Sequence, residues 1–279
     1  MEILCNGEAK NTRNAVEYLK RFKSFDFNIF HDPENLLKRI KRLLKIRSRL
    51  IVMGGDGTVN LAVRQMAGTE RRLGIVPTGR GNDFAKFLNI PLDPLQALIN
   101  VQKNNSKRIA LGRAGNRYFC NSFGIGFNGY VVALANRYDE SSYGWVAVKK
   151  FLRHNPFDIS LDVELVGGKK KRIEESVLFV AFSNGKTEGS CFRIGGKEDP
   201  EYQFLTMTIV KNAGYLERIL SFPFLLTSHF SKPRAVESLK VKKVEIKAPH
   251  PISKHIDGES FYENVKTVEV ADKSVSVLV

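Results

Sequence analysis

The chain has 279 residues, of which 43% are hydrophobic and 10% aromatic, enough for the cores of one large domain or two modest ones. Its formal net charge of +15 at pH 7 favours an anionic partner, which could be a nucleotide, a nucleic acid or an anionic lipid surface. The three cysteines, Cys5, Cys120 and Cys191, lie far apart without a Cys-x-x-Cys pair, which argues against a disulfide framework or a zinc site.

Two further patterns bear on where the protein works. The chain opens without the charged and apolar segments of a secretory signal, and it contains no run of eighteen apolar residues that would span a bilayer. We therefore expect a cytoplasmic protein that reaches any lipid substrate by associating peripherally with the membrane.

From residue 1 to about 112, strand and helix patterns alternate along the chain. The expected strands are residues 2–5, 26–30, 50–53 and 73–76, and the expected helices are residues 11–23, 33–47, 58–67, 82–88 and 93–103. Alternation of this kind is typical of a parallel, doubly wound sheet. We therefore predict an α/β nucleotide-binding domain over residues 1–112.

The positive charge is concentrated in this first half. Residues 1–115 hold 21 Lys and Arg against 10 Asp and Glu, and residues 38–49 hold seven Lys and Arg in twelve positions. Leucines and isoleucines recur at helical spacing around this run, which predicts an amphipathic helix with a basic outer face. That face is either an ordinary solvated surface or a docking surface for an anionic membrane. We expect no nucleic-acid partner, because no nucleic-acid-binding module accompanies the charge.

The strand at residues 50–53 runs directly into a glycine-rich loop, Gly54-Gly55-Asp56-Gly57-Thr58-Val59-Asn60. A strand, a glycine loop and a helix start together place backbone N–H groups around an anion, usually a phosphate. The loop contains neither Gly-Lys-Ser/Thr nor Gly-x-Gly-x-x-Gly, so it does not match the common phosphate-loop patterns. Its one carboxylate, Asp56, is costly beside phosphates unless it faces a cation, and we assign it to organising Mg²⁺ through water.

A second loop of the same kind follows the strand at residues 73–76. It contains Gly79, Arg80, Asn82 and Asp83, and the last two are suited to cap a helix that begins near Phe84. Two glycine loops at the carboxyl ends of strands are typical of a ligand crevice on an open α/β sheet. We therefore predict that both loops contribute to one nucleotide site.

From about residue 108 the pattern changes to short strands, many with period-two alternation. They are expected at residues 108–113, 117–124, 158–166, 173–184, 204–211, 240–248 and 264–279. Two helices are expected near residues 142–153 and 214–231, and the second would either pack on the sheet or form the lip of an acyl-chain groove. We predict an antiparallel β-sandwich over residues 113–279, with a last strand that returns toward the first domain.

The two glycine loops, at residues 54–60 and 77–85, resemble the Gly-Gly-Asp-Gly-Thr and Pro-x-Gly-x-x-Asn-Asp-Phe-Ala motifs of the diacylglycerol kinase catalytic domain family. These are lipid kinases related to the sphingosine and ceramide kinases and, distantly, to NAD kinase. The resemblance continues at residues 3–10, at Gly124-Ile125-Gly126-Phe127 and at Asp257-Gly258-Glu259. These spaced motifs, in the family's order, cover essentially the whole chain, and they imply an active site in the cleft between two domains.

The resemblance also implies roles for individual residues. Phosphoryl transfer needs clamped phosphates, neutralised charge and an oriented, deprotonated hydroxyl. The family pattern implies ATP as the phosphate donor, a loop from Asn6 to Lys10 that closes over the nucleotide, Mg²⁺ organised by Asp56, and Glu259 as the general base. The family's usual glycine is absent at the far end of that loop, where we expect Lys10 to compensate by contacting phosphate. Taken alone, the turn before Glu259 has a second interpretation, a hairpin in which Asp-Gly is chosen for its backbone dihedrals.

Several positions depart from the family pattern. Gly7 stands where a proline is usual, and Arg80 stands where Thr or Ser is usual. Arginine there would either bind a phosphate bidentately or crowd the adenosine pocket. His31 stands where the family often has Thr or Ser near the nucleotide, and we interpret it as a surface or packing residue.

A further departure concerns the metal. Tyr202-Gln203 replaces an Asp-Gly pair that the family carries before the strand at residues 204–211. Asp199 and Glu201 are nearby carboxylates that would have to substitute, so the metal ligands stay unassigned.

We predict a lipid kinase that transfers the γ-phosphate of ATP to a lipid hydroxyl at an anionic membrane surface, with diacylglycerol or a related glycerolipid as the acceptor. Two alternatives stay open. One is an NAD kinase-like enzyme, and the other is a degenerate kinase that binds nucleotide or lipid as a regulator. The oligomeric state stays open as well.

Overall fold

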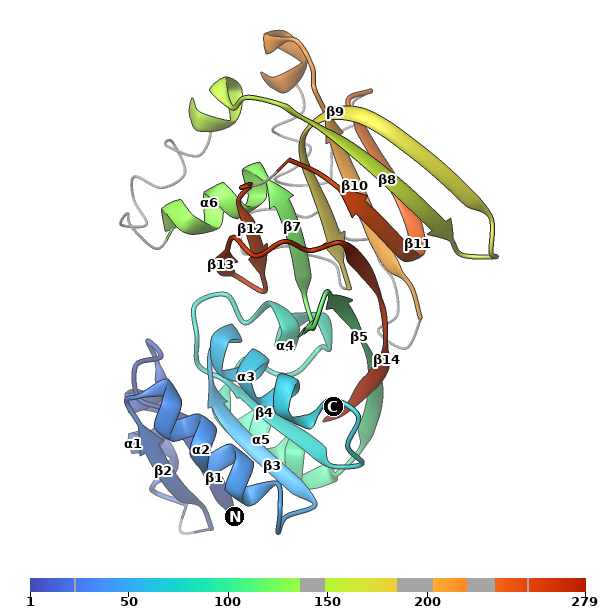
Figure 1. Ribbon diagram of the computed structural model, residues 1–279. Coiled ribbons are helices and arrows are strands. Elements are labelled where there is room, and N and C mark those ends of the chain that lie inside the picture. The colour runs from blue at the N-terminus through green and yellow to red at the C-terminus, as the bar shows by residue number, and fades with distance from the viewer. Residues whose placement is uncertain (23, 136–148, 185–202, 220–233, 250) are drawn as a thin grey trace. The chain divides into compact units, whose positions relative to one another are not determined.

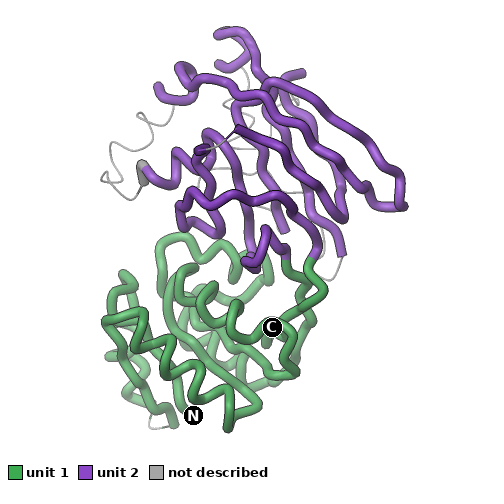
Figure 2. Tube along the Cα trace, in the orientation of Figure 1, with its two compact units in different colours: residues 1–111, 199–201, 271–279 green, residues 112–198, 202–270 purple. Residues whose placement is uncertain are grey.

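The computed structural model describes residues 1–22, 24–135, 149–184, 203–219, 234–249 and 251–279. The chain divides into two compact units, which Figure 2 colours separately. Of the described residues, 1–111 and 271–279 form unit 1 and the others form unit 2. Strands β5 (Ser106–Ala114) and β14 (Thr267–Leu278) each begin in one unit and end in the other.

Unit 1 is built on a parallel sheet with the strand order β2-β1-β3-β4, followed by the end of β14 (Figure 1). Its strands are β1 (Glu2–Asn6), β2 (Asp26–Phe30), β3 (Arg49–Gly54) and β4 (Arg72–Pro77). Its helices are α1 (Thr12–Leu19), α2 (Pro33–Leu43), α3 (Asp56–Met66), α4 (Asp83–Phe87) and α5 (Pro94–Lys103). The alternation of strands and helices in the sequence is therefore confirmed as a doubly wound α/β fold.

Local chemistry explains where these elements begin. Residues 50–54 of β3 are all buried, as expected for a parallel strand covered on both faces. Helix α2 begins at Pro33 after Asp32, whose side chain accepts a hydrogen bond from the Glu34 N–H at 3.0 Å. Helix α5 begins in the same way, with proline at the first position and an aspartate before it.

Unit 2 is an antiparallel β structure that includes helix α6 (Phe127–Ala135). Its other strands are β6 (Arg117–Phe119), β7 (Ser122–Gly126), β8 (Phe157–Leu165), β9 (Lys170–Ser183), β10 (Leu205–Lys211), β11 (Val236–Lys247), β12 (Lys254–Ile256) and β13 (Glu259–Phe261). Strands β8 and β10 both pair with β9 and with β11. The long strands β9 and β11 therefore each pair with β8 along one part of their length and with β10 along another. The resulting two layers of strands pack around one core.

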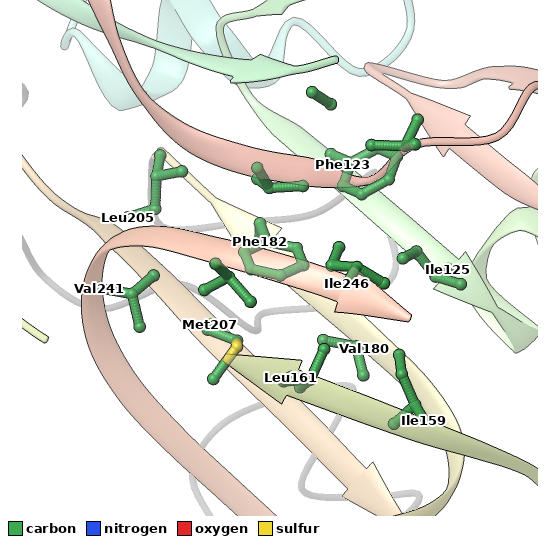
Figure 3. Close-up of a cluster of buried hydrophobic side chains, with 14 of the residues drawn as sticks. Phe123, Ile125, Ile159, Leu161, Val180, Phe182, Leu205, Met207, Val241 and Ile246 are labelled. Atoms are coloured by element: carbon green, nitrogen blue, oxygen red, sulfur yellow. The ribbon is translucent and has the colours of Figure 1, made fainter. Parts of the chain in front are cut away.

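Figure 3 shows this core, to which five strands contribute buried hydrophobic side chains. They include Phe123 and Ile125 from β7, Ile159 and Leu161 from β8, Val180 and Phe182 from β9, Leu205 and Met207 from β10, and Val241 and Ile246 from β11. In β7, β8, β9 and β10 the two residues lie two positions apart, as the period-two patterns in the sequence predict. In β11 they lie on either side of a register shift in the pairing with β8.

Two predictions for unit 2 were wrong. The sequence gives no clear helical periodicity at α6, and we predicted no helix there. The expected strand at residues 117–124 is two strands, β6 and β7, interrupted at Cys120 and Asn121. Of the expected helices, only residues 149–153 and 215–219 are described, and both are helical. The proposed groove lip at residues 220–231 lies outside the described residues.

Candidate functional site

The two glycine loops leave neighbouring strands at the same end of the sheet. Gly54, the last residue of β3, is in register with Pro77, the last residue of β4, and the Thr78 N–H donates to the Gly54 carbonyl at 2.9 Å. A Cβ atom added to Gly55 would lie 3.0 Å from the Cα atom of Gly79. The loops thus touch backbone to backbone, which glycine at both positions permits.

The first loop presents the amino end of α3. The first hydrogen bond of the helix runs from the Val59 N–H to the Gly55 carbonyl at 3.1 Å. The N–H groups of residues 56–58 therefore take no part in the hydrogen bonds between successive turns of the helix. Such an end attracts anions. The side chains of Val59 and Asn60 are 3% and 1% exposed. Both residues are therefore buried in unit 1, and their contact with a nucleotide stays a prediction.

Two carboxylates meet at these loops. A Cβ atom on Gly81 would lie 2.8 Å from Oδ2 of Asp56 and 3.6 Å from Oδ2 of Asp83. Burial, followed by the negative charge of Asp56, raises the pKa of Asp83, and Lys86 partly offsets the shift. A cation bound beside the two carboxylates would offset the repulsion between them.

Asn82 does not play the capping role that its position suggested. Its backbone is left-handed, with φ of 53°, and its side chain accepts from the Gly79 N–H at 3.0 Å and donates to the Gly79 carbonyl at 2.9 Å. Oδ1 of Asp56 instead accepts from the Phe84 N–H at 3.4 Å, in the first turn of α4. Asn82 therefore closes the second loop on itself, while Asp56 joins the first loop to the second.

A third loop, after β1, is tied to both of the others. Asn6 donates from Nδ2 to Oγ1 of Thr58 at 2.9 Å and accepts the Glu8 N–H at 3.0 Å. The buried hydroxyls of Thr12 and Thr78 lie 2.6 Å apart. Lys10 lies between Asn6 and Thr12 in the sequence and is exposed, and Arg80 is exposed on the second loop.

The strand order explains why the three loops gather here. In the order β2-β1-β3-β4 the direction of winding reverses between β1 and β3, and ligands of open α/β sheets bind outside the carboxyl ends of the strands at this reversal. Asn6 from β1 and Thr58 after β3 meet at this point. The sequence did not indicate the Thr12–Thr78 pair or the position of Gly81, because both depend on contacts between separate loops.

In unit 2 the predicted base lies in a tight hairpin between β12 and β13. Asp257 and Gly258 have φ of 48° and 85°, as in a two-residue turn with both central residues left-handed. The Asp257 carboxylate accepts the backbone N–H groups of Cys120 at 3.0 Å, Asn121 at 2.8 Å and Ser122 at 2.8 Å. Glu259 is exposed at the start of β13. Asp257 therefore anchors the turn, and Glu259 is the carboxylate that solvent reaches.

A cavity of about 1100 Å³ lies elsewhere in unit 2, and none of the predicted site residues is among its lining residues. Asp158, Glu174, Glu175 and Glu245 are among its lining residues, so it is poorly suited to an acyl chain. The departure at Tyr202, and the carboxylates of Asp199 and Glu201, lie outside the described residues.

Comparisons with known proteins match both units. Residues 6–114 match the family described as the diacylglycerol kinase catalytic domain. Residues 122–279 match the family described as the YegS C-terminal NAD kinase beta sandwich-like domain.

The chain is also similar to whole proteins. It is 28% identical, over 78% of its length and 72% of the relative's, to a YegS-like probable lipid kinase of Chromohalobacter salexigens. It is 27% identical, over 82% of its length and 75% of the relative's, to a diacylglycerol kinase of Mycobacterium tuberculosis. The crystal structure of a diacylglycerol kinase from Bacillus anthracis superposes with a TM-score of 0.75 at 17% identity, covering 99% of this chain and 95% of that one, which shows a shared fold.

Proposed function

Because the chain belongs to the lipid kinase family that carries the diacylglycerol kinase catalytic domain and the YegS C-terminal domain, we propose that it transfers the γ-phosphate of ATP to a lipid hydroxyl. The acceptor is diacylglycerol or a related glycerolipid. The observation that carries the proposal is the meeting of three loops at the winding reversal of unit 1, where Asp56 contacts the second glycine loop.

In this proposal the phosphates of ATP bind at the amino end of α3. The N–H groups of residues 56–58 supply donors there, and the glycines leave room for a close backbone approach. Lys10 and Arg80, both exposed beside the loops, supply positive charge.

Mg²⁺ fits the pair formed by Asp56 and Asp83. This ion keeps several waters and is commonly bound through one or two carboxylates together with substrate phosphates. Burial and then the negative charge of Asp56 raise the pKa of Asp83, and Lys86 offsets the shift only in part, so a cation beside both carboxylates would be favoured. When bound, the ion neutralises charge that develops on the phosphates.

Glu259 completes the proposal as general base. The lipid hydroxyl oxygen bonds to the γ-phosphorus, the bond from that phosphorus to the β,γ-bridging oxygen breaks, and ADP leaves. The hydroxyl proton passes to the Glu259 carboxylate. Exposure of Glu259 supports this role, while the three backbone N–H groups on Asp257 already occupy that neighbouring carboxylate.

Helix α2 supports a peripheral docking of the protein on anionic membranes. Leu36, Ile40 and Leu43 face the core, whereas Lys38, Lys41 and Arg42 are exposed. Arg39 does not belong to this outer face, because its guanidinium bonds to Oε1 of Glu2 at 2.5 Å. Among the described residues, no helix is long and apolar enough to cross a membrane.

Two other functions are distinguishable from this one. An NAD kinase-like reaction is suggested by the family description of unit 2, and a regulator without activity is suggested by Tyr202-Gln203 in place of the Asp-Gly pair. Incubation of the protein with γ-labelled ATP and Mg²⁺, with diacylglycerol, sphingosine, ceramide, NAD or no acceptor, separates the three. We expect label in diacylglycerol or a related glycerolipid. Label in NAD alone, or in no acceptor, would contradict the proposal.

A further inference from the structure

Thr78 is the residue at which all three loops of the proposed site meet. Its N–H donates to the Gly54 carbonyl of the first loop at 2.9 Å. Its carbonyl accepts, at 3.1 Å, the N–H of Asn11 in the third loop, which is residues 7–11 between β1 and α1. Its hydroxyl oxygen lies 2.6 Å from that of Thr12, the first residue of α1. Thr78 therefore joins the second loop to both of the others.

The hydroxyl pair in this junction is fully enclosed by protein. Thr12 is 0% exposed and Thr78 is 2% exposed. A buried hydroxyl that loses its partner cannot turn to water, so each of the two hydroxyls depends on the other. Two valines of the same shape would fill the same space without this dependence. What the hydroxyls add is direction, because a hydrogen bond fixes the distance between its two atoms more narrowly than an apolar contact does.

The third loop is consequently held at both of its ends. At one end the Asn6 side chain donates from Nδ2 to Oγ1 of Thr58 at 2.9 Å. At the other end Thr12 bonds to Thr78. Lys10 lies between these two connections in the sequence, and its side chain is exposed. The range of positions open to the Lys10 ammonium group is therefore set by where the two ends of the loop are held.

We propose that Thr12 and Thr78 are positioning residues for the nucleotide. Their hydroxyl bond holds the third loop against the second, and this keeps Lys10 within reach of the phosphates at the amino end of α3. The proposal assigns the two threonines no contact with the nucleotide, so they act only through Lys10. It rests on the proposed ATP site.

Titration calorimetry with ATP and with inorganic tripolyphosphate tests the proposal. Thr12→Val keeps the shape of the side chain and removes the hydroxyl. It should weaken the binding of both ligands by about 3- to 10-fold, as expected for one lost hydrogen bond. The two losses should be equal, because Lys10 is assigned to the phosphates, which both ligands carry. Thr12→Ser retains the hydroxyl and should bind both ligands as the wild type does.

Two double variants and a matched control complete the test. If the pair acts through Lys10, Thr12→Val in the Lys10→Ala background should cause no further loss of affinity. Thr12→Val combined with Thr78→Val leaves no unpaired buried hydroxyl, so it keeps the test available if a single variant folds poorly. It should weaken ATP binding as Thr12→Val does. Thr208→Val breaks a comparable pair in unit 2, Thr208 with Ser238 at 3.2 Å, and should change neither ligand's affinity.

The outcomes separate this inference from the proposed function. Wild-type protein that binds neither ligand would overturn the ATP site itself, and this inference with it. A Thr12→Val variant with a lower Tm but wild-type affinity for both ligands would show that the pair only stabilises the fold, and the ATP site would stand. An additional loss in the Lys10→Ala background, or no loss from Lys10→Ala itself, would contradict action through Lys10.

Discussion

Gly55 and Gly79 lie so close that a Cβ atom on the first would be 3.0 Å from the Cα atom of the second. The two residues belong to different loops, and each loop contributes to the proposed phosphate site. Their contact fixes the distance between the loops, and a side chain at either position must force them apart.

Gly79→Ala should therefore disable the site while the sheet still folds. The added methyl group meets Gly55 backbone, which has little freedom to move, and a displacement of about 1 Å at a phosphate site costs on the order of 10²-fold in rate. We expect a loss of that order in lipid phosphorylation. Gly214→Ala is the control, because a Cβ there meets nothing within 4 Å. Normal turnover in Gly79→Ala would show that the loop spacing does not matter.

Asp83→Asn should make the protein more stable and less active. The pKa of Asp83 is raised in the folded state, so its charge destabilises the fold fully above the raised pKa, and this penalty disappears below the ordinary value of 3.8. At pH 7 the variant should have the higher Tm, and the difference should shrink as the pH falls. Thermal melts over a pH series measure it. A variant that is less stable at pH 7 would contradict the proposed repulsion with Asp56.

The basic face of α2 should control membrane binding. Replacing Lys38, Lys41 and Arg42 with Gln should weaken binding to anionic vesicles by about 1 kcal/mol per residue, and binding by the wild type should fall with added salt. Arg39→Gln is a matched control, because Arg39 is paired with Glu2 and should affect stability more than vesicle binding. If the triple variant sediments with vesicles as the wild type does, α2 is only a solvated surface.

Arg80→Thr tests whether this arginine holds phosphate or obstructs the pocket. A guanidinium on an exposed loop beside Gly79 can form charge-assisted hydrogen bonds to a phosphate. We expect weaker ATP binding in Arg80→Thr by calorimetry. Tighter binding would mean that arginine crowds the nucleotide.

The sequence was sufficient for the α/β half of the fold, because strong local signals mark its elements. Buried apolar runs mark the strands, and Asp-Pro pairs mark the starts of α2 and α5. The sequence could not reveal the break between β6 and β7. There the N–H groups of Cys120, Asn121 and Ser122 turn toward the carboxylate of Asp257, which is more than a hundred positions away.

Tertiary contacts also explain the differences from prediction at the start of α4 and at α6. Asn82 is a good capping residue by type, but Gly79 offers it two hydrogen bonds, and Asp56 reaches the first turn of α4 instead. Helix α6 contains Gly129, and glycine disfavours a helix. The structure needs glycine there, because a Cβ would lie 2.4 Å from the backbone nitrogen of Lys254 and 2.5 Å from the carbonyl carbon of Ser253.

The most direct test of the account is the rate of γ-phosphate transfer from ATP to diacylglycerol or a related glycerolipid by the wild type and by Glu259→Gln. The amide keeps the size of the side chain but cannot accept the hydroxyl proton, and a positioned general base contributes about 10²–10⁴-fold. We predict that the wild type phosphorylates the lipid, and that Glu259→Gln does so slower by that factor with unchanged ATP affinity and stability. A wild type that phosphorylates none of the lipids, or a Gln variant that is equally fast, would contradict the account.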